Sequence, residues 1–126
     1  MPLVRVSLLK GRSTAAKLAI ADGVYDALRE VFSVPEDDKF VVFHEHDADG
    51  FIFQPSYLGI AHDDGLVILQ IAISDGRTVE LKQAFYRSVV ERLEADPGVE
   101  PRNVFINLIE VRKENWSFGD GVAQYV

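Results

Sequence analysis

The residue of this sequence with the most direct chemical potential is Pro2. Initiator methionines are normally removed before a small residue, and removal of Met1 would leave Pro2 as a secondary amine at the chain terminus. A terminal amine has a pKa of about 7.7–8.0, and an apolar pocket lowers it because burial disfavours the cation. Such an amine can act as a general base near neutral pH, or as a cationic acid beside a carboxylate. While Met1 is attached, Pro2 is a tertiary amide without basicity.

Two arginines occupy equivalent places, each after an expected strand and before an expected helix. Arg12 follows Gly11, and Arg77 follows Gly76. Open α/β sheets bind ligands at the carboxyl ends of their strands. A guanidinium there, beside the amides of a helix N-terminus, suits a carboxylate through a two-pronged contact. A solvated arginine in a turn is the alternative, which we favour for Arg12, whereas Arg77 is a candidate anion-binding residue.

Other side chains offer weaker chemistry. Asp38 precedes an expected strand, where a loop carboxylate is usually solvated. His44 and His46 alternate on that strand and share a face, so a metal site with Asp47, Asp49 or His62 is conceivable, but nothing in the spacing provides a third ligand and we expect no metal. Composition alone favours Trp116 and Phe118 as residues that seal a core or a subunit contact.

These residues must be positioned by an internal repeat, because the chain matches itself at an offset of 65 residues without a gap. The offset aligns Gly11 with Gly76, and it aligns chemically similar residues at Ser13/Thr78, Lys17/Lys82 and Glu45/Glu110. Each half reads strand, helix, strand, with strands expected at residues 3–9, 40–46, 66–73 and 104–111. The first helix is expected to bury an apolar face at the following residues: Leu18, Ala21, Tyr25, Leu28 and Phe32.

The repeat predicts the architecture. We expect one domain over residues 1–126, with βαβ repeat one at about 2–46, a loop or hairpin excursion at 47–64, repeat two at about 66–111 and a C-terminal tail at 112–126. Two βαβ units side by side give an α/β (α+β) fold, a four-stranded sheet with both helices on one face. The strands look apolar on both sides, so we expect the open face to be buried against other subunits.

Composition narrows the class of function. The 126 residues contain 20 acidic and 13 basic residues, a formal net charge of −7, and no cysteine. Nucleic acid and anionic membranes attract an excess of Lys and Arg, so neither is an expected partner. The absence of cysteine excludes thiolate nucleophiles, and no apolar stretch approaches the roughly 20 residues that span a bilayer. No secretory signal is recognisable at the start, so we expect a soluble cytoplasmic domain.

Taken together, these elements resemble the tautomerase superfamily (4-oxalocrotonate tautomerase-like), and within it most closely the malonate semialdehyde decarboxylases. The resemblance rests on the strand beginning at Pro2, the duplicated βαβ unit with Gly-Arg-Ser/Thr at both helix starts, and the segment at residues 115–119, Asn-Trp-Ser-Phe-Gly. It extends over nearly the whole chain, and Trp-Ser-Phe-Gly is its most specific element.

The resemblance implies a homotrimer with the sheets facing inward around a central barrel, and no cofactor. It implies a catalytic Pro2 after removal of Met1, and an Asp38 that sets the charge state of the proline or activates water. Arg77 matches an arginine that binds the substrate carboxylate, while Trp116 and Phe118 match aromatic residues in the wall of the site. One position departs from the family pattern, because Asp75 stands where the best-known members carry a second substrate-binding arginine.

The implied activity is decarboxylation of a small anionic 3-oxo acid that resembles malonate semialdehyde. Two related activities use the same parts: keto-enol tautomerisation with neutral Pro2 as the general base, and hydration with Asp38 activating water. A non-catalytic oligomeric binding protein that keeps the fold and Arg77 is the alternative from another class. Asp75 and the presence of Met1 favour that alternative.

Overall fold

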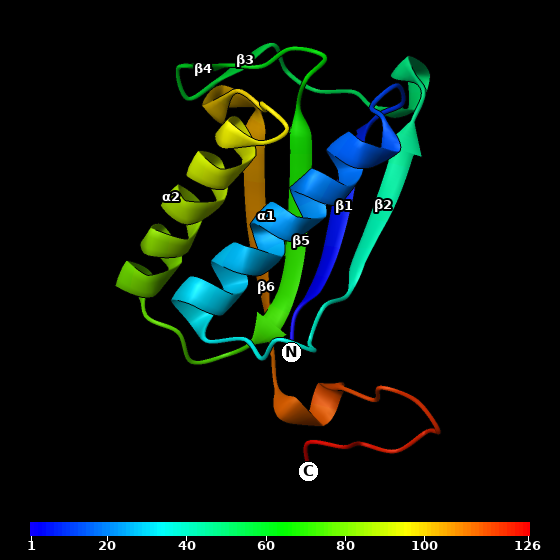
Figure 1. The fold of residues 1–126 in the computed structure, drawn as a ribbon, viewed down its shortest axis with the longest axis vertical. Coiled ribbons are helices and arrows are strands. Elements are labelled where there is room, and N and C mark those ends of the chain that lie inside the picture. Colours follow the sequence, from blue (N-terminus) through cyan, green and yellow to red (C-terminus); the bar gives the residue numbers. More distant parts are fainter.

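The computed structural model describes residues 1–126 and shows a four-stranded sheet, two long helices, a small hairpin and a C-terminal tail (Figure 1). None of the helices is long and apolar enough to cross a membrane. In chain order the helices and strands are β1 (Leu3–Leu9), α1 (Thr14–Phe32), β2 (Val41–His46), β3 (Ser56–Tyr57), β4 (Ile60–Ala61), β5 (Val67–Ser74), α2 (Val79–Ala95) and β6 (Val104–Val111).

The sheet has the strand order β2-β1-β5-β6. Strands within each βαβ unit are parallel, whereas β1 and β5 at the centre are antiparallel. Their register pairs Val4 with Ile71 and Val6 with Leu69. This is the pairing that a two-fold relation between the two units requires, since the 65-residue offset superposes Val4 on Leu69 and Val6 on Ile71. The fold class expected from the repeat is therefore confirmed.

The two units also share their helix caps and ion pairs. Ser13 Oγ accepts a hydrogen bond from the Ala16 amide at the start of α1, and Thr78 Oγ1 accepts one from the Leu81 amide at the start of α2. Capping of this kind satisfies amides that the first helical turn leaves unpaired. Equivalent lysine–glutamate pairs tie each helix to its second strand, with N–O distances of 2.9 Å for Lys17–Glu45 and 2.7 Å for Lys82–Glu110.

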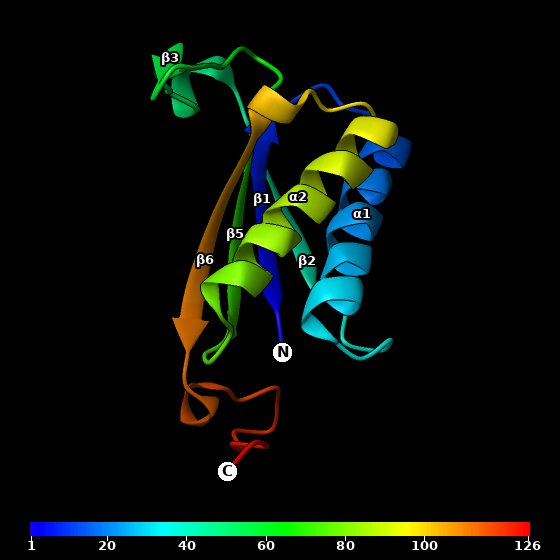
Figure 2. The same cartoon turned by 90° about the vertical axis from the view of Figure 1, so that its left-hand side faces the viewer.

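Both helices cover the same face of the sheet, where the single hydrophobic core lies (Figure 2). Phe32 of α1 stacks on Phe85 of α2 with 4.7 Å between the ring centroids. One expectation is wrong, because Leu18 is 59% exposed. The buried face of α1 is centred on Ile20, Val24 and Ala27, and Leu18 precedes Ile20 by two residues, which turns it to the opposite side of a 3.6-residue helix.

The uncovered face of the sheet is mixed rather than apolar, which corrects the expectation of strands that are apolar on both sides. Phe105 and Ile109 of β6 are exposed there. Between them, however, the register aligns Arg5 with Gln70 and Gln70 with Asn107, so a polar row crosses the centre of this face. The alternation of side chains along each strand places these residues opposite the buried core.

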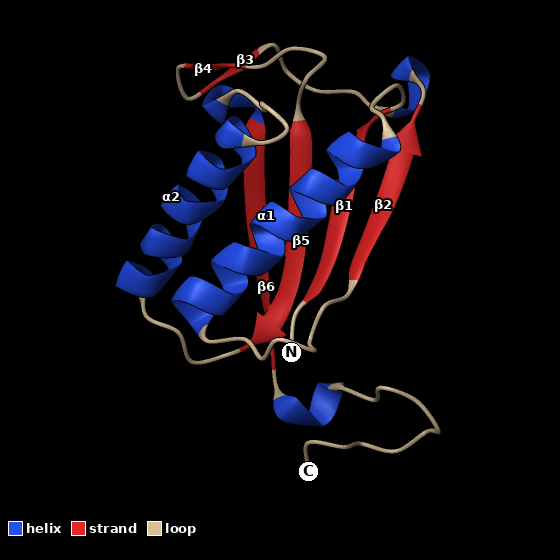
Figure 3. Cartoon of the chain, viewed as in Figure 1, coloured by secondary structure: helices blue, strands red, loops and turns tan.

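The excursion and the tail lie at opposite ends of the sheet, as the secondary-structure colouring shows (Figure 3). The strands of the hairpin are β3 and β4, which Leu58 and Gly59 connect in a turn with positive φ angles at both residues. The chain start lies at the end of the sheet from which the tail projects, beside the carboxyl ends of β5 and β6 (Figure 1). This end carries the candidate site.

Candidate active site

Parallel pairing of β1 and β2 brings the chain start next to Asp38. Pro2 is buried and precedes β1, Asp38 precedes β2, and the Val4 amide donates a hydrogen bond to the Phe40 carbonyl at 3.0 Å, which joins the two segments. The terminal amino group, here that of Met1, lies 3.8 Å from Asp38 Oδ2. Only 9% of the Met1 side chain and 11% of the Asp38 side chain are exposed, so this ion pair is shielded from water.

Burial shifts the pKa values of both groups of this pair so that their neutral forms are favoured. It lowers the pKa of the terminal amine below 8.0, and the positive charge of Arg77 lowers that pKa further, although Asp38 opposes the shift. Burial raises the pKa of the Asp38 carboxyl above 3.8, against the effect of the amine. Asp38 Oδ1 is buried and has no hydrogen-bond partner. The desolvation cost therefore exceeds the attraction within the pair.

Arg77 enters the same end of the molecule from the turn after β5. Its guanidinium donates hydrogen bonds to the carbonyls of Ser74 at 2.6 Å and Phe32 at 3.5 Å, and it lies 4.7 Å from the centroid of the Phe32 ring. Burial lowers the pKa of Arg77, against the nearby charge of Glu110. Because Glu110 is already paired with Lys82, the positive charge of Arg77 remains available to an anion.

Arg12 lies at the other end of the sheet, because the central strands β1 and β5 run antiparallel. Its guanidinium donates a hydrogen bond to the Gly65 carbonyl at 2.8 Å. The offset of 65 residues places Asn103 where repeat one has Asp38, and Asn103 is buried and hydrogen-bonded to Asp63. The end of the sheet near Arg12 thus lacks a chain terminus and has an amide where the other end has the Asp38 carboxylate, so the two equivalent arginines lie in chemically different surroundings.

The tail places aromatic rings beside the amine and Asp38. Trp116 stacks on Phe118 with 5.5 Å between centroids, and Phe118 meets the edge of Tyr125 at 4.9 Å. The Trp116 Nε1 is buried without a hydrogen-bond partner. Trp116 and Phe118 therefore form one aromatic cluster, and Tyr125 extends it.

A cavity of about 310 Å³ opens between the tail and the segment before β2. Its lining residues come from the chain start, the loop after α1 and the tail: Met1, Pro35, Asp37, Asp38, Phe40, Phe118 and Tyr125. Two of the aromatic members, Phe40 and Tyr125, were not identified from the sequence. The position of Phe40 next to Asp38 is a signal that could have found the first, whereas the irregular tail offers no periodicity that could have found the second.

Asp75 and the two histidines lie apart from this cavity. The Asp75 amide donates a hydrogen bond to the Val111 carbonyl at 3.0 Å, and the exposed Asp75 side chain forms no ion pair. His44 is hydrogen-bonded to Arg5 at 3.0 Å, and the ring of His46 stacks on Phe51. No three histidine, aspartate or glutamate side chains lie close enough to hold a metal ion.

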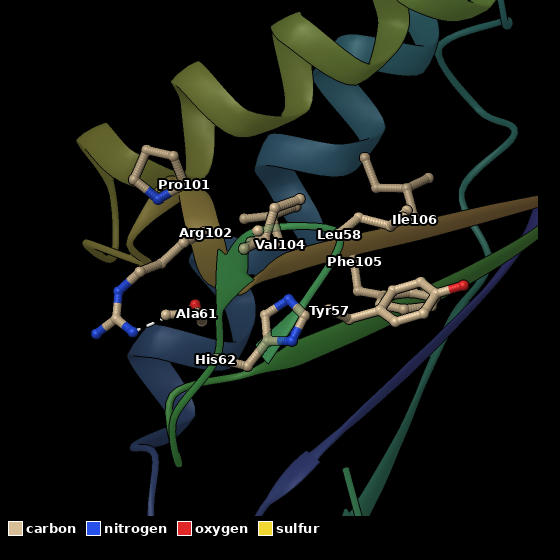
Figure 4. A pocket seen from close by; sticks show the side chains of 11 residues that line it. Tyr57, Leu58, Ala61, His62, Pro101, Arg102, Val104, Phe105 and Ile106 are labelled. Atoms are coloured by element: carbon tan, nitrogen blue, oxygen red, sulfur yellow. Dashed lines mark hydrogen bonds between the residues drawn. The ribbon is translucent and has the colours of Figure 1, made fainter. Parts of the chain in front are cut away.

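A larger cavity, of about 640 Å³, lies at the opposite end between the hairpin and β6 (Figure 4). Its titratable lining groups are Tyr57, His62 and Arg102. Arg102 donates a hydrogen bond to the Ala61 carbonyl and pairs with Asp63 and Glu100, at N–O distances of 2.5 Å and 2.6 Å. Arg102 is thus held by these three neighbours. The cavity beside Asp38 is the candidate active site, because the chain start and the Asp38 carboxylate line it together.

Comparison with known proteins shows which family the chain resembles. A family model described as tautomerase enzyme matches residues 38–119, and a second model with the same description matches residues 2–61. Two Bacillus subtilis proteins, "Probable tautomerase YusQ" and "Probable tautomerase YrdN", are 35% and 34% identical over the whole of this chain. The match covers 99% and 97% of those proteins.

Solved structures show the same fold. An FG41 malonate semialdehyde decarboxylase inhibited by 3-bromopropiolate is 39% identical, with a TM-score of 0.89 over 98% of this chain and 93% of that one. Another malonate semialdehyde decarboxylase, described with decarboxylase and hydratase activities, is 29% identical, with a TM-score of 0.90 over 98% and 95% of the two chains. The matches to family models and the 35% identical relative, which span most or all of the sequence, show that this chain belongs to the tautomerase superfamily.

Proposed function

We propose that this chain decarboxylates a small 3-oxo acid that resembles malonate semialdehyde. The observation that carries the proposal is the meeting of three charged groups at one end of the sheet. The terminal amine lies 3.8 Å from Asp38 Oδ2, and the charge of Arg77 acts on the pKa of that amine. The identity of 39% to a solved malonate semialdehyde decarboxylase supports the choice of substrate class.

The reactive amine in this proposal is that of Pro2, which the removal of Met1 would place at the chain terminus. Arg77 holds the substrate carboxylate, and Asp38 holds the proton on the Pro2 amine. The bond between the carboxylate carbon and the α-carbon then breaks, CO₂ leaves, and the bonding electrons form an enolate whose charge lies on the former carbonyl oxygen. The cationic amine stabilises that oxygen electrostatically, and a proton then adds to the α-carbon. In the covalent variant of this step, the neutral Pro2 amine condenses with the carbonyl and water leaves, which forms an iminium; the electrons of the broken bond then form an enamine, and its protonation and hydrolysis release the aldehyde and the free amine.

The surroundings strengthen these contacts. Trp116 and Phe118 shield the site from water, and charges attract one another more strongly where water is excluded. Asp75 supplies a negative charge near the turn that carries Arg77, where a second arginine would attract the substrate. We therefore expect weaker substrate binding than an arginine at this position would give.

A second function, keto-enol tautomerisation, is favoured by burial of the chain start, which lowers the pKa of the Met1 amine and would act on a Pro2 amine in the same direction. A neutral amine is the form that removes a proton from a substrate, and burial favours that form. The Bacillus subtilis relatives carry tautomerase in their names. Hydration with Asp38 activating water is a related outcome that the same cavity would accommodate.

The pH dependence of kcat separates the first two functions. If the amine acts as a neutral base, the rate falls as the pH drops through the lowered pKa of the amine. If the amine acts as a cation, the rate falls as the pH rises through the same value. We therefore measure kcat against pH for the Met1-processed protein with an enol and with a 3-oxo acid. A fall at low pH indicates a neutral base, and a fall at high pH indicates a cationic amine.

We also propose that the single domain, built from two βαβ repeats, assembles as a homotrimer. The exposed Phe105 and Ile109 on the uncovered sheet face support burial of that face against other copies. Light scattering on the purified protein tests the assembly, for which the expected mass is three times 14.1 kDa before Met1 removal. A monomer at micromolar concentration would contradict it.

The function itself is tested with Pro2→Ala. Intact mass first establishes that Met1 is absent, and malonate semialdehyde decarboxylation and phenylenolpyruvate tautomerisation are then assayed on both proteins. We expect the variant to lose most of the activity, because alanine replaces the secondary amine that the proline ring holds in one orientation with a primary amine that rotates freely. Unchanged rates would rule out both catalytic roles of Pro2, whereas a lack of both activities in the Met1-processed wild-type protein would favour the non-catalytic binding protein.

A further inference from the structure

Tyr125 brings a hydroxyl group into the wall of the candidate active site. It lines the cavity of about 310 Å³ together with Asp38, the chain start and Phe118. The residue is 40% exposed, and its hydroxyl forms no hydrogen bond within the chain. A residue whose hydroxyl has no partner in the protein thus lines the space in which we propose that the substrate binds.

Contacts within the tail fix the position of this ring. The ring of Tyr125 meets Phe118 edge-on at 4.9 Å, and Phe118 stacks on Trp116. The preceding residue, Gln124, accepts a hydrogen bond from the Phe118 amide at 2.9 Å and donates one to the Gly119 carbonyl at 3.1 Å. The phenol is therefore held in place before any ligand arrives, as an efficient hydrogen-bond donor to a transition state should be.

The charge of Asp38 favours the protonated form of this phenol. Burial raises the pKa of Tyr125 above 10.0, and the negative charge of Asp38 raises it further. The hydroxyl therefore keeps its proton at neutral pH and acts as a donor. The phenol donor and the chain start therefore line the same cavity, and Arg77 lies nearby, where it can hold the carboxylate of the substrate.

We infer that Tyr125 contacts the substrate and donates a hydrogen bond to the carbonyl oxygen of the bound 3-oxo acid. This inference rests on the proposed function. As the bond to the leaving carboxylate breaks, electron density moves onto that oxygen, and the phenol hydrogen bond strengthens. The hydroxyl thus lowers the barrier of the chemical step more than it tightens substrate binding.

The test is Tyr125→Phe, which keeps the ring that packs on Phe118 and removes only the hydroxyl. Loss of one preorganised donor to a developing oxyanion reduces kcat by about 100- to 1,000-fold in well-defined sites. We expect at least a roughly 10-fold loss of kcat on malonate semialdehyde, with KM changed less than about threefold. The matched control is Tyr57→Phe, which removes an exposed hydroxyl from the hairpin at the other end of the sheet and should leave kcat unchanged.

The outcomes are distinguishable. If the wild-type protein is active and Tyr125→Phe keeps its kcat, the role of Tyr125 is overturned while the proposed function stands. If the wild-type protein acts on neither the 3-oxo acid nor the enol, both fall together. A variant that loses kcat and also loses more than a few degrees of melting temperature would indicate a structural role for the hydroxyl and overturn the inference.

Discussion

Replacement of Arg77 by alanine should weaken substrate binding by an amount that the structure lets us work out. A guanidinium carries five N–H groups. Two of them donate to the carbonyls of Ser74 and Phe32, so three remain for a ligand. A hydrogen bond to a charged group contributes about 1.5–3 kcal/mol, and each 1.4 kcal/mol is a factor of ten. Loss of the carboxylate contact should therefore raise KM by roughly 10- to 150-fold.

The assay is steady-state decarboxylation by Arg77→Ala, with Arg12→Ala as the matched control. Arg12 occupies the equivalent turn of the other repeat but lies at the opposite end of the sheet, beside Gly65. We expect its KM to match that of the wild type. If Arg77 holds the carboxylate equally in the ground and transition states, kcat changes little.

The reasoning would be refuted if Arg77→Ala kept the wild-type KM, or if Arg12→Ala raised KM as much. Because Arg77 also ties two backbone carbonyls together, melting temperatures of both variants must accompany the kinetics. Arg77→Lys is a further check: a lysine restores the charge without the planar fork, so we expect it to recover only part of the affinity.

Three further outcomes concern stability. Asp38→Asn should raise the melting temperature at pH 7 and leave it unchanged near pH 3. Burial raises the pKa of Asp38 above 3.8, so ionisation of this carboxyl lowers the stability of the folded protein as the pH rises. Equal effects at both pH values would contradict this. Phe85→Ala should cost about 3–5 kcal/mol in urea unfolding, since Phe85 is fully buried and stacks on Phe32; a loss below 1 kcal/mol would argue against this packing. Thr78→Ala should cost about 1 kcal/mol by removing the cap of α2, and an unchanged unfolding midpoint would show that the cap contributes nothing.

The repeat made most of the fold predictable. An offset of 65 residues aligned Ser13 with Thr78 and Lys17 with Lys82, and the structure shows that these residues make equivalent caps and ion pairs. Local signals of this kind depend on neighbours in sequence or on one strand–helix contact. Such signals can be recognised in the sequence without knowing how the two units pair in the sheet.

The burial of individual faces was less predictable, because it depends on which neighbour each face meets. Leu18 fitted an apolar spacing of three and four residues, yet the sheet meets the side of α1 that carries Ile20 and Val24. The polar row on the uncovered face depends on the cross-strand register of Arg5 and Gln70, which composition does not reveal.

The candidate site was predictable in part. Parallel pairing within a βαβ unit brings the segments before β1 and β2 together, which accounts for Asp38 beside the chain start. The separation of Arg12 from Arg77 follows from the antiparallel pairing of β1 with β5. Tyr125 could not be predicted, because the tail folds by contacts between aromatic rings and by the side chain of Gln124 rather than by any periodic pattern.

If the Pro2 amine does the chemistry, chains with and without Met1 must differ in activity. Both forms can be prepared from this sequence, quantified by intact mass, and assayed with malonate semialdehyde in mixtures of known composition. We expect a rate proportional to the fraction of chains that begin at Pro2, and no activity from chains that keep Met1. Equal rates from the two forms would contradict it.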